Sequence, residues 1–545
     1  MERAPRGLAR IWEQLRRRHV AWRSVLCLVG IAAMWLVMQP WHPGFRFRID
    51  YVPPRDVVAR VPFKIPDPRA IGVETGKHLL YEPGQMLVKG GQKLGRDSLE
   101  LLRAEHQAYI QKLPLERKLE RSLAVFALVL ALYGLVGYYI YHREPRLIRD
   151  LRRFTTALAV SVVTVLLARW TGADPWRAEV IPMLLFAMTF GIAYGREMAL
   201  VLSLALSVFL AVANAHSVAE TIVVMGVVTS AVVQLGSIRS RRKLIKVCFY
   251  AALAAPLLTL GVGLLDSQPA SALVTPAVYN AVWTLLAGFL ITGLLPFIEG
   301  LFGVLTEISL LELGDVAHPL LQELVRRAPG TYNHSINVAS IAEAAAESIA
   351  AGGLLVRVGA YFHDIGKMLK PDYFVENRGS EASRHDALVP AMSTLIIIAH
   401  IKDGADLARQ HHLPEPIIDF IEQHHGTTLV EYFYRRASEQ SETNPNGGNV
   451  EESAFRYPGP KPQTIEAAVL MMADAVESAS RVLVEPTPAR IENLVEDIAM
   501  KKLLDGQFDE CGLTLKQLRT VEDSLIKSLT AVYHGRVKYP DQRTA

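Results

Sequence analysis

Histidine and aspartate side chains that could bind metal are concentrated in one part of this sequence. His363 and Asp364 are adjacent in VGAYFHDIGKMLK, and eight of the sixteen histidines fall between residues 334 and 425. An isolated histidine usually packs or caps a helix, and we interpret His318, His385, His411 and His412 in that way. The predicted metal ligands are His334, His363, Asp364, His400, His424, His425 and Asp474.

The type and number of these side chains predict two metal ions and phosphoester hydrolysis. A carboxylate beside the aromatic residues of VGAYF costs several kcal/mol to bury unless it is paired or bound to metal. Imidazole and carboxylate suit iron, manganese, zinc or cobalt, and six or seven ligands are too many for one tetrahedral ion. With Asp364 as the bridge, two ions about 3.5–4 Å apart could hold a hydroxide for in-line attack on a phosphodiester. Lys367 then either offers its charge to phosphate or is a solvated charge at a helix end.

Helices are predicted to position these ligands. Apolar residues recur at helical spacing in 335–350, 354–366, 394–410, 415–425 and 465–481, with more helix over 488–534. We expect an all-α domain over 331–536 and a frayed tail over 537–545. Residues 437–453 are polar and rich in Gly and Asn, and they predict a flexible loop.

Eight apolar segments precede this domain and predict a membrane protein. Half of the residues are hydrophobic (50%), and the mean hydropathy is +0.21. The basic segment 1–23 leads into a signal anchor over 24–40, and seven further spans of about 17–23 residues lie within 119–300. The loops 143–153 and 239–243 are basic, so the positive-inside rule places the N-terminus, both loops and the C-terminal domain in the cytoplasm. The predicted localisation is the inner membrane.

The remaining regions are smaller. Residues 41–118 combine short β-like runs with an amphipathic helix and predict a small mixed α/β extracytoplasmic domain, and 301–330 predicts a helical connector broken at Pro329-Gly330. The overall fold class is therefore mainly α. A net charge of +4 gives no argument for a DNA or RNA polymer as partner, and three cysteines without a CxxC pair exclude a disulfide framework. The partners expected are a small substrate and the lipid bilayer; the sequence leaves homo-oligomerisation and the signal sensed by the membrane part open.

The chain resembles the seven-transmembrane HD phosphodiesterases, bacterial membrane enzymes that hydrolyse cyclic di-AMP. The resemblance covers nearly the whole length and is carried by HPLLQEL, APGTYNHS, GAYFHDIGK, HHGTT and YPGPKPQT in this order. It implies two iron or manganese ions and the linear product pApA, with regulation through the membrane domain as a further hypothesis.

The resemblance also implies residue roles. His334, His363, Asp364 and Asp474 would hold one metal, and Asp364, His400, His424 and His425 the other. From the residues themselves, Asp364 and Lys367 are the predicted catalytic residues. Substrate contacts are expected near HHGTT and YPGPKPQT, and the residues proposed for them are Thr427, Thr428, Tyr457 and Lys461.

Two departures and two alternatives accompany this hypothesis. Asn333 stands where the family often has a histidine, and the extracytoplasmic part is much shorter than usual, which weakens the case for sensing outside the cell. Cyclic di-GMP hydrolysis is the first alternative, although the Gly-Tyr-Pro motif of the HD-GYP group does not follow His424 and His425. The second is a receptor or scaffold whose HD domain binds a ligand without catalysis.

Overall fold

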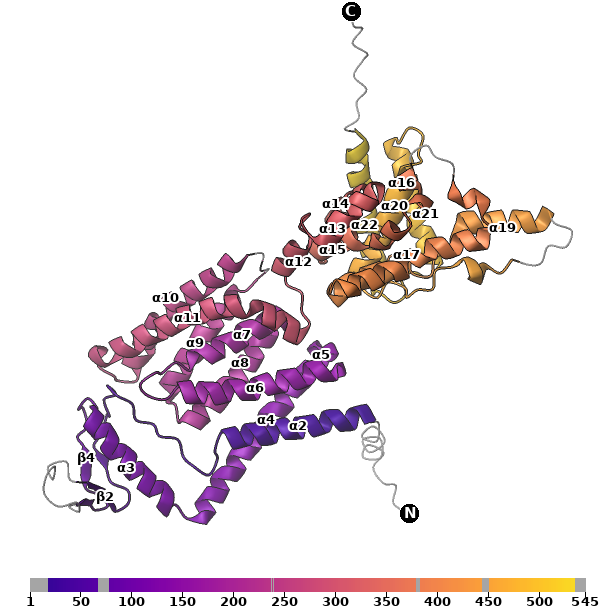
Figure 1. Cartoon of the computed structure of the whole chain (residues 1–545). Coiled ribbons are helices and arrows are strands. Elements are labelled where there is room, and N and C mark those ends of the chain that lie inside the picture. Colours follow the sequence, from indigo (N-terminus) through magenta and orange to yellow (C-terminus); the bar gives the residue numbers. More distant parts are fainter. Residues whose placement is uncertain are drawn as a thin grey trace, which may run out of the picture. The chain divides into compact units, whose positions relative to one another are not determined.

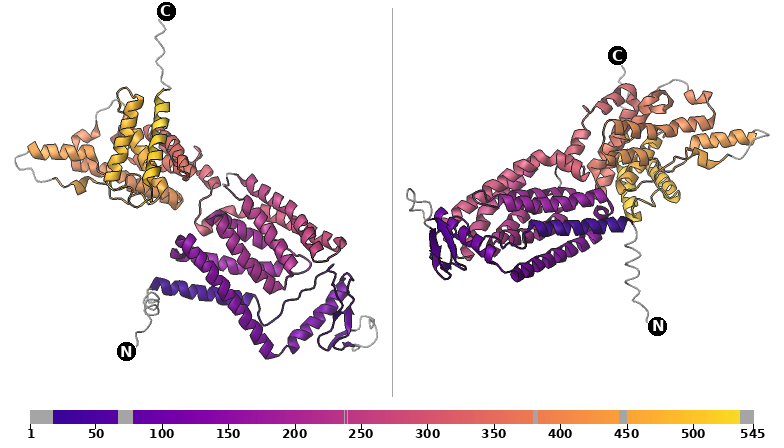
Figure 2. Two further views of the ribbon diagram at one scale, coloured as in Figure 1. Left: turned by 180° about the vertical axis from the view of Figure 1, so that it is seen from behind. Right: turned by 60° about the horizontal axis from the view of Figure 1, so that its bottom comes forward.

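The computed structural model divides into two compact units, Met1–Thr306 and Glu307–Ala545. It describes residues 18–66, 78–236, 238, 240–378, 383–443 and 450–534. Residues 1–17 of the basic segment predicted over 1–23, and the tail predicted over 537–545, lie outside the described residues, and residues 18–23 belong to the first helix. Figures 1 and 2 show that helices make up most of each unit. The predicted mainly α fold class is confirmed.

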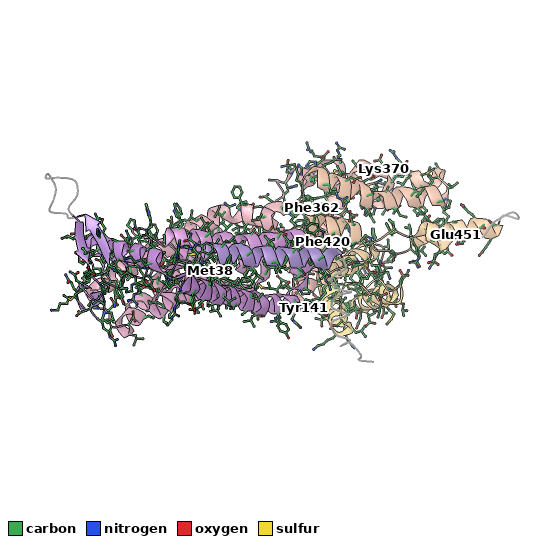
Figure 3. All side chains as sticks on the ribbon, turned by 90° about the horizontal axis from the view of Figure 1, so that it is seen from below. Met38, Tyr141, Phe362, Lys370, Phe420 and Glu451 are labelled. Atoms are coloured by element: carbon green, nitrogen blue, oxygen red, sulfur yellow. The ribbon has the colours of Figure 1, made fainter. Side chains whose placement is uncertain are left out.

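Eight apolar helices of the first unit coincide with the eight predicted spans. Six of them are long and apolar enough to cross a membrane, whereas α7 and α9 have 15 and 17 residues. Their outer faces are apolar: Tyr141 of α4, labelled in Figure 3, is 66% exposed, and Leu257 of α10 is 72% exposed. Such faces require lipid, so this is a multi-pass membrane protein. The helices are α2 (Arg18–Val37), α4 (Leu115–Arg143), α6 (Leu151–Thr171), α7 (Val180–Tyr194), α8 (Arg196–Asn214), α9 (Val218–Gln234), α10 (Arg241–Leu265) and α11 (Ala270–Phe302), with the short α5 (Pro145–Arg149) between α4 and α6.

Helix α7 lies at the centre of the bundle. It packs against α6, α8, α9 and α11. Phe186 and Phe190 of α7 stack with ring centroids 4.3 Å apart, and both are buried. A helix that is apolar on every side is buried on every side, which explains why α7 shows no amphipathic pattern.

The residues before α4 form a small mixed α/β module, as predicted. Strands β1 (Val57–Val58) and β4 (Met86–Val88) pair antiparallel, and so do β2 (Phe63–Pro66) and β3 (His78–Tyr81). Helix α3 (Arg96–Lys112) packs against β2 and β4. Glu105 of α3 accepts hydrogen bonds from the Arg60 side chain at 3.0 and 2.7 Å.

This module is attached to the membrane bundle by polar contacts. Val52 exchanges two backbone hydrogen bonds of 3.0 Å with the side-chain amide of Gln268, which precedes α11. Arg177, which precedes α7, donates to the carbonyl of Ile49. The module is therefore held against the loops at one end of the bundle.

The second unit is all α, as predicted, and is built around α20 (Ile465–Ser480). Residues 467–474 are all buried, because α14, α15, α18, α21 and α22 pack around this helix. The other elements are α12 (Glu307–Leu313), α13 (Pro319–Arg327), α14 (Pro329–Ser348), α15 (Gly353–Phe362), η1 (Ile365–Leu369), η2 (Pro371–Tyr373), α16 (Val375–Arg378), η3 (Arg384–Ala387), α17 (Pro390–Gln410), α18 (Glu415–Gln423), α19 (Glu431–Thr443), η4 (Glu452–Phe455), α21 (Pro488–Leu504) and α22 (Leu515–His534).

Two boundaries differ from the sequence predictions. Residues 437–443 belong to α19 and not to a loop, and η4 is tied to the segment before α19 by a 2.9 Å hydrogen bond from Val430 to Phe455. The polar residues that predicted a loop lie on the solvent-facing side of this helix. The connector does break as predicted, but Pro329 is the first residue of α14. A proline is tolerated there because the backbone N–H of the first helical residue has no partner within the helix, so its absence costs nothing.

Candidate metal centre

Five helices bring the predicted ligands together. His363 and His424 are the C-terminal caps of α15 and α18. His334, His400 and Asp474 lie within α14, α17 and α20. Helix α15 packs against α14, α18 and α20, and η1, which follows Asp364, packs against α17. The ligands are far apart in sequence but lie on neighbouring elements.

Glycines allow these elements to approach closely. A Cβ on Gly366 would lie 1.9 Å from the carbonyl oxygen of His400, so only glycine fits there. A Cβ on Gly359 of α15 would lie 2.4 Å from the ring of Phe420 in α18, a residue labelled in Figure 3. The backbones that carry His363, His400 and His424 are therefore held at short range.

Asp364 occupies the centre of the cluster. Its Oδ2 lies 3.2 Å from Nε2 of His363 and 3.6 Å from Nε2 of His334. Its Oδ1 lies 3.4 Å from Nε2 of His400 and 3.6 Å from Nε2 of His424. The two oxygens therefore face two different pairs of histidines.

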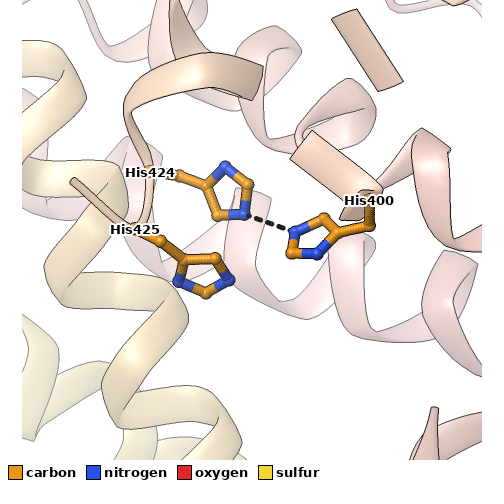
Figure 4. Close-up of side chains that lie close together, drawn as sticks. All are labelled: His400, His424 and His425. Carbon is orange, nitrogen blue, oxygen red and sulfur yellow. Dashed lines mark hydrogen bonds between the residues drawn. The ribbon is translucent and has the colours of Figure 1, made fainter. Parts of the chain in front are cut away.

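A third side chain joins each pair. Asp474 adds a carboxylate to His334 and His363, whereas His425 joins His400 and His424 (Figure 4). In each trio the donor atoms lie within 4.8 Å of one another. Nε2 of His400 and Nε2 of His424 are 3.3 Å apart. Two three-ligand sets thus lie on either side of one shared carboxylate.

Backbone carbonyls orient the imidazole rings. Nδ1 of His363 faces the carbonyl of Ala360 at 2.7 Å, that of His400 faces Ile397 at 2.5 Å, and that of His424 faces Ile421 at 2.9 Å. A carbonyl only accepts, so each Nδ1 carries the proton in the neutral ring. In the neutral ring each Nε2 therefore carries the lone pair, which is the tautomer that a metal ligand requires.

The burial and the charge of these side chains are those expected at a site that binds cations. Among the described residues, both oxygens of Asp364 and Nε2 of His363 are buried without a well-oriented hydrogen bond. Burial lowers the pKa of His400 to about 3, so this imidazole is neutral and able to bind metal. Burial raises the pKa of Asp364, but the charges of His363 and Lys367 outweigh it and hold the pKa well below its usual range.

Lys367 lies against the bridging carboxylate. Its Nζ is 2.7 Å from Oδ2 of Asp364 and 3.1 Å from Oε1 of Glu376, and its side chain is 13% exposed. The alternative of a solvated charge at a helix end is therefore wrong. The sequence analysis did not identify Glu376, because an acidic residue nine positions after Lys367 does not by itself indicate a contact between the two.

The proposed substrate contacts lie close to the ligands. Tyr457 is buried and stacks on His425 with ring centroids 4.4 Å apart. Thr427 exchanges hydrogen bonds with Gln507, and Thr428 donates to the carbonyl of His425 at 2.8 Å. Nζ of Lys461 is 3.5 Å from Asp509. Both threonines have intramolecular partners, so of these residues Tyr457 is the one that directly lines the cluster.

Glu477 is the supporting residue that the sequence analysis missed. Its Oε2 accepts from Nδ1 of His334 at 2.6 Å, and Arg481 holds its Oε1 at 2.6 Å. A carboxylate behind a histidine ligand fixes the ring and makes it a stronger ligand. The spacing of Asp474 and Glu477, three residues apart on one helix, places both on the same face and could have indicated it.

Two family models match this chain, one in each of its two compact units. Residues 120–306 match the model of the 7TM receptor with intracellular HD hydrolase, and residues 331–479 match that of the HD domain. The chain therefore carries a region similar to the membrane part of the 7TM receptors with intracellular HD hydrolase, followed by an HD domain. An HD domain implies divalent metal binding, in agreement with the two ligand sets around Asp364.

Curated relatives match over part of their length. The cyclic-di-AMP phosphodiesterase PgpH of Bacillus subtilis (strain 168) is 43% identical over 314 residues, which are 57% of this chain and 43% of that protein. The PgpH of Listeria monocytogenes serotype 1/2a (strain 10403S) is 48% identical over 251 residues, which are 46% of this chain and 34% of that protein. The chain spans less than half the length of either relative.

Proposed function

We propose that this protein is a membrane-bound, metal-dependent phosphodiesterase that hydrolyses cyclic di-AMP to linear pApA. The observation that carries the proposal is the position of Asp364, whose two oxygens face two separate trios of nitrogen and oxygen donors. The substrate follows from the names of the two relatives, which are 43% and 48% identical to this chain. Cyclic di-GMP remains the alternative substrate for the same site.

Each trio would hold one divalent ion. His334, His363 and Asp474 would hold the first, His400, His424 and His425 the second, and Asp364 would bind both. Iron and manganese suit this set of imidazoles and carboxylates. Two such ions supply an activated water and offset the charge of the phosphoryl oxygens.

The chain's own side chains would position the substrate. Lys367 neutralises one side of Asp364 and directs the carboxylate at the ions, while Glu376 holds the ammonium in place. The buried ring of Tyr457 offers an apolar surface beside His425 on which an adenine could stack. Thr427 and Thr428 shape this wall through their hydrogen bonds, and Lys461 supplies a positive charge near its edge.

The site would face the cytoplasm, where cyclic dinucleotides are made. The basic loops 143–153 and 239–243 lie on the same side as the N-terminus when α2, α4 and α6 to α11 all cross the bilayer. An odd number of crossings would place the second unit on the opposite side from the N-terminus, so the short α7 and α9 must either both cross the bilayer or both not cross it.

The test uses the full chain purified in detergent and loaded with manganese or iron. Cyclic di-AMP and cyclic di-GMP are supplied separately, and products are separated by chromatography. We expect conversion of cyclic di-AMP to pApA and a loss of at least about 100-fold in Asp364→Ala, because both ions lose their shared ligand. Glu439→Gln, an exposed position on α19, is the matched control and should retain full activity.

Two results would contradict the proposal. Turnover of cyclic di-GMP alone would move the substrate to the alternative. Stoichiometric metal with neither nucleotide cleaved would leave a metal-binding HD module without this activity, as the receptor hypothesis requires.

A further inference from the structure

A large cavity lies at the end of the membrane bundle that carries the α/β module. Its volume is about 1060 Å³, and it is lined by residues 43–60 of the module and by the adjoining ends of α9, α10 and α11. All of these residues belong to the first unit. Cavities of this size hold small organic molecules.

One wall of the cavity carries an ionic cluster. Arg48 of the module lies 3.2 Å from Glu179, which precedes α7, and 3.0 Å from Glu220 in the first turn of α9. Glu220 is fixed in place because it also forms a capping box with Ser217. Two carboxylates share one guanidinium, so the cluster carries a net negative charge.

Two polar atoms of this wall lack a partner. Among the described residues, Oε2 of Glu179 and Nε2 of His216 are buried without a hydrogen bond. The side chains of Glu179 and His216 are 9% and 2% exposed, and Nε2 of His216 lies 3.8 Å from the other carboxylate oxygen of Glu179, Oε1. A buried acceptor left unpaired costs about 1–3 kcal/mol, which a donor supplied by a ligand would recover.

The other charged groups of the lining largely balance one another. Arg60 is paired with Glu105 at 2.7 Å, and Arg177 with Asp174 at 2.9 Å. Arg46 lies over the ring of Phe47, 4.9 Å from its centroid. Arg55, Asp50, Asp56 and Asp266 also line the cavity. Counting five arginines and six acidic side chains in the lining, the charge of the whole wall is again negative by one.

The rest of the wall is apolar or aromatic. Val223 and Val224 of α9 and Leu273 of α11 line the membrane side, and Phe45 and Tyr279 add rings. Such a surface stabilises an apolar group beside the charged one.

We propose that this cavity binds a small amphipathic molecule whose ammonium group donates to Glu179 while its apolar part packs against α9 and α11. This site is separate from the metal centre and independent of the proposed hydrolysis. The ammonium could belong to a free amine or to the headgroup of a lipid such as phosphatidylethanolamine, and the two sources share the same chemistry.

The test measures binding to the full chain in phosphatidylglycerol nanodiscs by calorimetry. The probe is 2-phenylethylammonium, with neutral 2-phenylethanol and anionic 3-phenylpropanoate as isosteres. We expect saturable binding of the ammonium alone and a loss of about tenfold or more in affinity for Glu179→Gln. Glu82→Gln, at an exposed position on the same module, should bind as the wild type does.

The three probes also decide the question in the unmodified protein, so the outcome does not depend on folding of the Glu179 variant. Equal binding of all three probes, or no saturable binding of the ammonium, would overturn the proposal. Adding phosphatidylethanolamine to the nanodiscs distinguishes the sources. Weaker apparent binding of the probe would assign the site to a lipid headgroup, and unchanged binding would assign it to a free amine.

Discussion

At the scale of single residues, the metal centre depends on atoms behind the ligands as well as on the ligands. The Nδ1 atoms of His363, His400 and His424 face carbonyls of their own helices, and that of His334 faces Glu477. These partners determine which nitrogen is free to bind an ion.

Glu477→Gln should weaken metal binding without removing a ligand. A neutral amide makes His334 a weaker ligand and orients it less well, so we expect the affinity for the first ion to fall by about 10- to 100-fold. Competition with a chelator measures this change in the purified second unit. Glu466→Gln, on the same helix α20, is the control, and an equal loss there would mean that the effect is not specific to His334.

Metal binding should also stabilise the second unit. An ion at 100 times its dissociation constant adds about 2.7 kcal/mol to the free energy of unfolding. For a unit of this size that corresponds to a rise of about 5–10 °C in Tm. Calorimetry with and without manganese checks this, and Asp364→Asn should abolish the rise. A rise that persists in Asp364→Asn would place the stabilising ion elsewhere.

The sequence indicated all seven proposed ligands because their types are unusual in apolar helices. The family resemblance implied their division into two sets around Asp364, but residue types and spacing alone could not indicate it, since it depends on how α14, α15, α17 and α18 pack. Glu477 was missed because an acidic residue three positions along an Ala-rich helix is common on solvent-facing surfaces. Lys367 was left undecided because helix spacing alone does not show what covers a side chain.

At the scale of elements, helix position was predicted well and helix ends less well. The apolar periodicity of α14, α17 and α20 was long enough to identify each helix. The last turns of α19 have few apolar residues, so composition favoured a loop where the backbone stays helical. The glycines between ligand-bearing elements gave no periodic pattern at all.

Gly366→Ala should disturb the metal centre from outside the ligand set. The added methyl group would overlap the carbonyl of His400, so η1 and α17 must separate. We expect a loss of about 1–3 kcal/mol in the free energy of unfolding, together with weaker metal binding. Chemical denaturation and metal analysis measure both. Gly352→Ala is the control, because among the described atoms its Cβ would meet nothing closer than 3.4 Å.

At the scale of the whole molecule, the proposed arrangement in the membrane rests on the basic loops 143–153 and 239–243. In the proposed topology eight crossings would place the α/β module and the second unit on opposite sides of the bilayer, with α7 counted as a span because α6, α8, α9 and α11 pack around it. Hydropathy alone could predict the number of spans. It could not show that Arg48, Arg177 and Gln268 connect the module to the bundle.

Cysteine labelling tests this topology. In a chain whose three native cysteines are replaced by serine, Glu100→Cys in α3 should react with a membrane-impermeant maleimide in spheroplasts. Lys516→Cys in α22 should react only after the membrane is permeabilised. Both positions are exposed, so access is limited by the bilayer alone. Labelling of Lys516→Cys in intact spheroplasts would reverse the orientation.

The hydrogen bonds between Val52 and Gln268 have a mechanical consequence. Gln268 stands two residues before α11, and α11 is a single helix of 33 residues, about 50 Å long at 1.5 Å per residue. It ends at Phe302, five positions before the second unit begins at Glu307. The module is therefore coupled to α11, and we expect a displacement of the module to be carried along this helix towards the residues that precede the second unit.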